Sequence, residues 1–257
     1  MRPFGEFIDR QHEARDVLIL STHGISLLPH VPNAIRVFAE RENDPDSAAA
    51  TDYAHRLEVA KRQAELAQRE VDTGFPLLYG QWAVALWNAL ECLIRDFLAS
   101  WLANEPSASQ LEAVRKIRIP LADYEAMTPE ERHYYVIDML ERDHGIPLRR
   151  GINRLEDLLA IFGLSGPVKD ETQKHLFELC QVRHVLVHRR GIADRRLIQA
   201  CPWLDLKPGN PVIITPIMAY HYWEATDDYL ATVIRRVRSR LSPSGDPPDN
   251  TVTSASP

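Results

Sequence analysis

The residues best suited to chemistry lie in one short segment, residues 176–194, which reads LFELCQVRHVLVHRRGIAD. The segment contains an arginine and two histidines that are one helical turn apart: Arg183, His184 and His188. Imidazole titrates near neutral pH and transfers protons, whereas guanidinium keeps its charge and binds phosphate in a planar, two-pronged geometry. We therefore first asked how the fold would present these three side chains.

A helical wheel that starts at Leu176 predicts where these side chains point. Arg183 falls at about 340°, in the centre of an apolar stripe from about 280° to 40° that we expect to face the core. The stripe is made of Leu179, Cys180, Leu186 and Val187. An arginine on a core face is costly unless its charge is paired or a ligand uses it. His184 and His188 fall at about 80° and 120°, so His188 converges with Arg183 only across a two-fold axis.

The hexapeptide Arg183-His184-Val185-Leu186-Val187-His188 resembles the R-x4-6-H motif of HEPN domains, including the polar residue directly after the arginine. The surroundings are similar too, because a tryptophan-rich helix with Glu91 precedes the motif helix and Arg-Arg-Gly-Ile-Ala-Asp follows it. The resemblance covers about residues 75–241. It implies cleavage of RNA by its own 2′-OH, without a metal or cofactor, in a homodimer with a composite active site.

The resemblance also implies a role for each residue of the motif. His188 would be the general base, a contribution worth about 10²–10⁴-fold. Arg183 would stabilise the charge on the phosphate and help to keep His188 neutral at rest. His184 would orient the site or act as an acid. Proteins of this family often act as toxins or in phage defence, so an antitoxin or regulatory protein is an expected partner besides RNA.

Residues outside the motif are expected to support it. Glu91 lies at the edge of the apolar arc of its helix and is our candidate for pairing with Arg183, and Arg95, one turn later, would complete an ion-pair network. A local excess of positive charge, opposed only by Asp194, would attract a phosphodiester backbone. It consists of Arg183, Arg189, Arg190, Arg195 and Arg196.

Plainer interpretations stay open. Arg183 fits a structural ion pair, His188 an ordinary histidine beside a helix C-terminus, and His184 a solvated side chain. The two histidines also have the i, i+4 spacing of zinc ligands, but the H-E-x-x-H pattern is missing, so no metal is expected. At the level of function, the alternatives are a catalytically inactive HEPN scaffold that binds RNA, a nucleotide or a protein partner, and a helical regulator with a coincidental motif.

Composition excludes several classes of protein. The net charge of −6 argues against a protein that coats nucleic acid by bulk electrostatics. Of the 257 residues 45% are hydrophobic, which argues against a chain that is disordered throughout. The sequence has no P-loop and no serine-nucleophile elbow. Three dispersed cysteines indicate buried, reduced thiols, and no apolar run approaches the roughly 18–20 residues of a membrane span. We therefore expect a soluble, cytoplasmic protein that does not enter a membrane.

The pattern of elements predicts an all-α fold. Apolar periodicity and caps place helices at about 47–72, 81–104, 128–144, 154–162, 168–190 and 215–241, the last ending in a basic run that favours a solvated helix end over an RNA clamp. The segment 212–214 is a brief strand or half of a hairpin with residues near Leu206. The prediction is a HEPN-type up-down helical bundle at 75–241, with a short β-hairpin-like insertion before the last helix. Residues 1–74 are a helical extension of unclear role, in which 1–45 is undecided, and 242–257 is a disordered tail.

Overall fold

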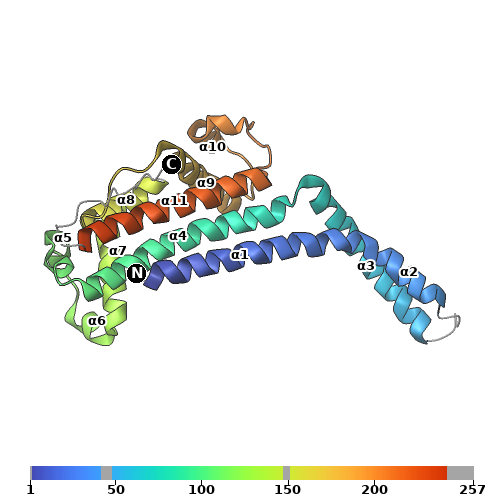
Figure 1. The fold of residues 1–257 in the computed structure, drawn as a ribbon, viewed down its shortest axis with the longest axis horizontal. Helices are drawn as coiled ribbons and strands as arrows, with labels where there is room; N and C mark the ends of the chain where they lie inside the picture. The colour runs from blue at the N-terminus through green and yellow to red at the C-terminus, as the bar shows by residue number, and fades with distance from the viewer. Residues whose placement is uncertain (1, 42–47, 147–150, 242–257) are drawn as a thin grey trace, which may run out of the picture.

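The computed structural model describes residues 2–41, 48–146 and 151–241, and these are mostly helical (Figure 1). In these ranges no strand forms, and the only sheet-like pairing is one isolated bridge between Ile192 and Pro211. The prediction of an all-α fold is therefore confirmed. The tail 242–257 lies outside the described residues.

The core is built around α4 (Pro76–Asn104), the most apolar helix of the chain. Its most extensive contacts are with four helices: α1 (Arg2–Leu27), α7 (Pro129–Asp143), α9 (Asp170–His188) and α11 (Pro216–Leu241). Contact on several sides explains why its buried side chains, among them Trp87 and Leu90, form a broad arc and not a narrow stripe. Within the described residues α4 is the one helix long and apolar enough to cross a membrane, but its position is that of a core helix.

The described residues before Gly74 form helices, and most of these extend away from the bundle. Residues 1–45 were undecided from sequence; in the structure α1 is followed by a 3₁₀ turn, η1 (Leu28–His30), and by α2 (Val31–Arg41), which packs against α3 (Ala48–Thr73). The start of α1 belongs to the main core, since the rings of Phe4 and Phe97 lie 4.9 Å apart. Much of α1 lies beside α4, whereas its last part, with η1, α2 and α3, projects from the bundle (Figure 1). We call the described residues between 17 and 73 the arm.

The arm is continuous with the bundle through α1, and its second connection is a sharp reversal at Gly74 and Phe75. Both residues have left-handed backbone angles, with φ of 77° and 59°. The amide of Phe75 donates to the carbonyl of Glu70 at 2.7 Å, which closes α3, and Pro76 opens α4. The helix stop predicted at Gly74 and Pro76 is confirmed, because glycine tolerates a left-handed backbone and proline suits a first helical turn.

Capping residues define the other helix starts. Thr128 and Glu131 form a reciprocal capping box at the start of α7, with Glu131 N donating to Thr128 Oγ1 at 3.3 Å and Thr128 N donating to Glu131 Oε2 at 2.7 Å. Thr215 accepts a bond from Met218 N at 3.2 Å and opens α11. Both predicted starts are confirmed, since each side chain satisfies amides that lack a helical partner.

The segment before α11 differs from the predicted hairpin. It holds α10 (Arg195–Ala200) and a 3₁₀ turn, η4 (Pro202–Leu204). Val212 N donates to Gly191 O at 2.7 Å and Ala193 N to Asn210 O at 2.8 Å, so residues 209–212 pair with residues 191–193 and not with residues near Leu206. The pairing closes a loop around α10, which sequence analysis had missed together with the short η2 (Ala108–Gln110), α5 (Glu112–Arg115) and α6 (Leu121–Ala126).

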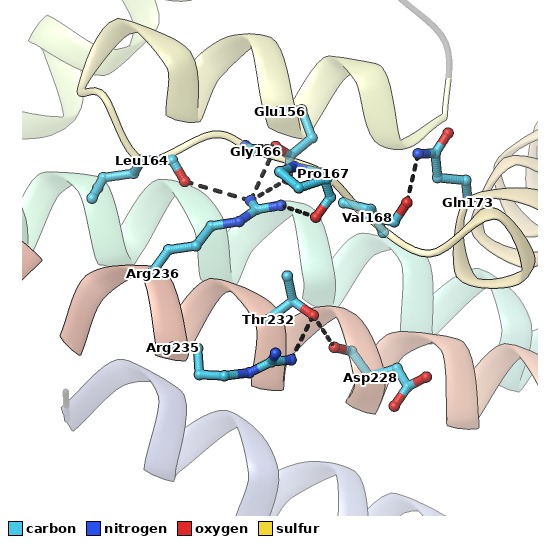
Figure 2. A network of polar contacts seen from close by, with 10 residues as sticks. All are labelled: Glu156, Leu164, Gly166, Pro167, Val168, Gln173, Asp228, Thr232, Arg235 and Arg236. Carbon is cyan, nitrogen blue, oxygen red and sulfur yellow. Dashed lines mark hydrogen bonds and ion pairs between the residues drawn. The ribbon is translucent and has the colours of Figure 1, made fainter. Parts of the chain in front are cut away.

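A half-hidden arginine fastens the loop before α9 to α11 (Figure 2). Arg236 donates to both oxygens of Glu156 at 2.9 and 3.0 Å, and to the carbonyl of Pro167 at 2.9 Å. Glu156 belongs to α8 (Ile152–Ile161) and also accepts from Gly166 N at 3.0 Å. The basic run at the end of α11 is thus not purely solvated, because Arg236 turns inward while its neighbour Arg235 contacts only Thr232 on its own helix.

Candidate functional site

Arg183 of α9 lies against α4 and is held there by an amide. Its Nε and Nη2 donate to Asn88 Oδ1 at 3.2 and 3.0 Å, and both side chains are half-buried. The predicted ion pair with Glu91 is wrong: Glu91 accepts a bond from Arg154 of α8 at 2.8 Å. The reason is geometric, since α9 runs along α4 so that Arg183 meets Asn88, one turn before Glu91.

Glu91 and Arg95 do belong to one ion-pair network, as predicted, but their partners come from α7 and α8. Arg95 pairs with Asp138 and lies 3.9 Å from Glu141, and Arg154 lies 3.8 Å from the same Glu141 carboxylate. Glu141 is buried, which explains why two guanidinium groups gather around it. The network thus joins three carboxylates to two guanidinium groups and leaves Arg183 outside it.

The start of α8 is pressed close to α9, and this places Arg154. Gly151 has a φ of 60°, and a Cβ there would lie 2.9 Å from Cδ2 and 3.1 Å from Cα of Phe177. Only glycine fits such an approach with a left-handed backbone. The result is a pocket of about 360 Å³ between α4, α7, α8 and α9. Its wall includes Asn88, Glu91, Arg95, Glu141, Arg154 and Arg183.

The inward face of α9 is not the one expected. Its fully buried apolar residues are Leu176, Leu179, Val182 and Val185, whereas Val187, assigned to the stripe, is 47% exposed. The buried arc is displaced because α9 packs between α4 and α11 and also buries Glu178 and Gln181. Arg183 consequently lies at the edge of the buried face and not at its centre.

The two histidines of the motif lie together at the exposed end of α9. The ring centroids of His184 and His188 are 4.9 Å apart with a tilt of 51°. His184 is half-buried and His188 exposed. Burial, with the neighbouring His188 and Arg196, lowers the pKa of His184 below its usual value. His184 is therefore neutral at pH 7, which suits a proton acceptor better than a donor.

The positive charge predicted around the motif is present at this surface. Arg189, Arg190, Arg195 and Arg196 are all exposed. Asp194 faces Arg189 at 3.6 Å and also caps α10 by accepting from Leu197 N at 2.8 Å. Its carboxylate is thus partly engaged by a helix N-terminus, so the patch remains strongly basic despite the acidic total of the chain.

The structure brings the histidines together but gives Arg183 other neighbours. The contacts of Arg183 are on the α4 side of α9, and those of His188 are with His184. Sequence reasoning missed Asn88, Arg154 and Glu141 as members of this region. One signal was available for α4: Asn88, Glu91 and Arg95 follow i, i+3, i+7 spacing and form a polar line on an apolar helix.

A second polar cluster, also missed from sequence, surrounds a buried carboxylate on α9. Glu178 accepts bonds from the hydroxyl of Tyr222 at 2.7 Å and from the indole nitrogen of Trp203. Burial and the Glu178 carboxylate raise the pKa of Tyr222 far above its usual value, so its hydroxyl remains a donor. One turn before Glu178, His175 stacks on His221 of α11 at 4.9 Å. The cluster ties η4 and α11 to the helix that carries the motif.

Comparison with protein-family models, with curated proteins and with solved structures gives no match. The resemblance to HEPN domains therefore rests on the residues of the motif, and the fold shares with it only the all-α character. Across the described part of the chain, no group of three or more His, Cys, Asp or Glu side chains is placed to hold a metal ion. Of the three cysteines, Cys201 is buried and Cys180 half-buried, but Cys92 is exposed, against expectation.

Proposed function

We propose that this chain is a metal-independent endoribonuclease of the HEPN type, active as a homodimer, with a role in phage defence or as a toxin. The observation that carries the proposal is the state of Arg183. This arginine is half-buried beside a pocket, yet its partner is the neutral amide of Asn88 and not a carboxylate. An arginine that is positioned but not neutralised is suited to bind an anion.

The hydrogen bonds of Arg183 support this role. A guanidinium group has five N–H donors, and the contacts with Asn88 use Nε and Nη2. The remaining donors are free to make the paired contacts that a phosphate accepts. Because the Asn88 amide carries no charge, it fixes the rotamer of Arg183 without competing with the phosphates of RNA for the guanidinium charge.

His184 and His188 support the proton-transfer part of the proposed reaction. In the proposed step, His188 takes the proton of the 2′-hydroxyl while the 2′-oxygen attacks phosphorus. The bond to the 5′-oxygen then breaks, and His188 returns the proton to that oxygen. The products are a 2′,3′-cyclic phosphate and a 5′-hydroxyl. His184, whose ring centroid lies 4.9 Å from that of His188, orients it.

A second subunit is part of the proposal because Arg183 and His188 leave α9 in different directions. Val187 points between them and is 47% exposed, and Leu77, Ile192 and Ile217 are further exposed apolar side chains in the segments around this end of α9. Apolar residues around a polar site favour coverage by another protein surface. A two-fold axis near Val187 would place His188 of each subunit near Arg183 of the other.

The test is an RNA cleavage assay in EDTA with end-group analysis. We expect the wild type to produce 2′,3′-cyclic phosphate ends. His188→Ala and Arg183→Ala should lower the rate by about 100-fold or more. The matched controls are His55→Ala and Arg36→Ala, two exposed positions on the arm, which should cleave at the wild-type rate. Cleavage that is equal in all five proteins, or that needs a divalent metal, contradicts the proposal.

The alternative is a catalytically inactive scaffold that binds RNA, a nucleotide or a protein partner. It is favoured by the separation of Arg183 from His188 within one protomer. In the same assay it predicts intact RNA together with binding that Arg183→Ala weakens and His188→Ala leaves unchanged.

A further inference from the structure

One face of the arm carries a line of exposed apolar and small residues that covers about 20 residues of α1, η1 and α2. Every position of this line is exposed. A Cβ added to Gly24, in the middle of the line, would meet no atom within 4 Å. We call the line the stripe, and it consists of Val17, Leu20, Gly24, Leu27, Val31, Ala34 and Phe38.

The spacing of the stripe is that of a coiled-coil seam. Successive members are three, four, three, four, three and four residues apart, which is the a/d pattern of three heptads. A regular alternation of this kind keeps one helical face turned toward a partner helix over a long distance. The stripe thus has the pattern of a helix–helix contact without a described helix against it.

The neighbouring face of the same helices is already used inside the chain. One residue after each member of the stripe lies a half-buried position with the same spacing, and α1, η1 and α2 all contact α3. These positions are Leu18, Ser21, Ile25, Leu28, Pro32, Ile35 and Ala39. The apolar arc is therefore wide enough for two partners, and α3 covers only one side of it.

The uncovered surface is large for a monomer. Leu20, Leu27 and Phe38 are 68%, 66% and 60% exposed. With Val17 and Val31 they present roughly 500 Å² of apolar side chain, a size at which patches mark interaction sites. Together with flanking atoms this approaches the roughly 800 Å² per partner of a stable interface. The arm has little core of its own, since among the residues of α3 whose burial is described, 52–73, the buried ones are Ala60 and Ala67.

The charge of this segment favours a second copy of the same chain over other occupants. Between residues 17 and 38 the only acidic or basic side chain, histidines aside, is Arg36. Two copies can meet there without repulsion between like charges. A charged partner would find no complementary residues, and an interfacial membrane helix usually carries Lys and Arg along its polar face.

We propose that two copies of this chain pair through their stripes as antiparallel helices. An antiparallel arrangement places each a position opposite a d position of the second copy, and the side-chain sizes then complement each other. Gly24 faces Leu27, Ala34 faces Val17, and Leu20 faces Val31. A parallel arrangement would set Gly24 against itself and leave a void. The pairing is independent of the proposed active site.

The test is the oligomeric state of the full-length protein, measured by sedimentation or light scattering at about 1 to 100 µM. In a Val187→Glu background, which removes the proposed contact at the end of α9, we expect a dimer whose dissociation constant rises about 100-fold or more in Leu27→Glu, because the carboxylate would be buried without a partner. Leu20→Gln, a neutral change at an exposed position, should weaken the dimer less. The matched control is Leu66→Glu, which alters an equally long, 52% exposed side chain of the arm outside the stripe.

Val187→Glu separates this interface from the one in the proposed function, because it should abolish a contact at the end of α9 and leave arm pairing intact. A monomeric wild type at about 100 µM overturns the inference, whether or not it binds lipid vesicles. So does a dimer that Val187→Glu dissociates and Leu27→Glu does not. For the orientation, Gly24→Cys and Leu27→Cys chains in a Cys92→Ser background should cross-link when mixed. Cross-linking of Gly24→Cys alone contradicts the antiparallel arrangement.

Discussion

The guanidinium group of Arg183 donates twice to one oxygen of Asn88, at 3.2 and 3.0 Å. Asn88→Asp keeps the shape and adds a negative charge. We expect RNA cleavage, or RNA binding if the protein is inactive, to fall about tenfold, since the ion pair would compete with phosphate. Thermal unfolding should shift little or upward. Asn33→Asp is the matched control, because Asn33 accepts the same kind of bond from Arg36 at 2.9 Å on the arm. An unchanged rate in Asn88→Asp would show that Arg183 does not meet the substrate.

Stability should decrease on mild acidification because of His175. Burial and the stacked ring of His221 lower the pKa of His175 in the folded protein. The unfolded chain, with a histidine pKa near 6.5, therefore takes up the proton first as the pH falls. The free energy of unfolding should be lower at about pH 5.5 than at about pH 7.5, above the range in which carboxylates titrate.

His175→Gln should flatten this dependence, as urea unfolding at the two pH values would show. His55→Gln, on the exposed surface of α3, should leave the slope unchanged. The pKa of His184 is lowered too, so this residue should contribute a slope of the same sign. A wild-type protein that is more stable at the lower pH would contradict the assignment.

Arg236 should matter for stability although it lies in a basic run. Arg236→Met leaves Glu156 without its cation, and because each side chain of the pair is only 15% exposed we expect a loss of about 3 kcal/mol. Arg235→Met, one residue earlier, should change the free energy of unfolding by no more than about 0.5 kcal/mol. Chemical denaturation of both variants gives the comparison. Adding Glu156→Gln to Arg236→Met should restore part of the lost stability. Equal stability of Arg236→Met and Arg235→Met would contradict a stabilising role for Arg236.

Glu178→Gln tests the buried carboxylate of α9. The amide keeps one acceptor oxygen and turns an NH2 group toward a donor, either the Tyr222 hydroxyl or the Trp203 indole. We expect a loss of about 1–3 kcal/mol. Urea unfolding followed by tryptophan fluorescence measures it. Glu171→Gln, exposed in the first turn of the same helix, is the control and should cost less than about 1 kcal/mol.

Local rules explain which parts of the fold were predictable. The helix starts at Thr128 and Thr215 and the break at Gly74 depend on hydrogen bonds within a few residues, so the sequence shows them directly. Residues 17–20 were ambiguous because a short apolar run fits both a strand and a buried helix. The helix α10 was hidden by the prolines around it, and its stability comes from the Asp194 cap and from the pairing of residues 209–212 with 191–193.

The candidate site shows the limit of a helical wheel. The motif residues could be chosen from sequence because imidazole and guanidinium suit few structural roles together. Their partners could not, because which side of α9 faces α4 depends on packing between distant helices. Arg183 was placed in the centre of the buried face, but contact of α9 with both α4 and α11 rotates that face away. Because the buried face is rotated, Arg183 contacts Asn88 and not the predicted partner Glu91.

The left-handed pair Gly74 and Phe75 has a mechanical consequence. A long flexible linker would let α3 swing about the bundle, but here helix meets helix through two residues whose backbone angles are restricted. Since α1 also runs unbroken from the bundle into the arm, we expect the angle between the arm and the bundle to vary little. A molecule bound at the far end of the arm would then lie at a definite distance and orientation from the basic end of α9. Binding at the arm would thus restrict which substrates or partners can reach the basic end of α9.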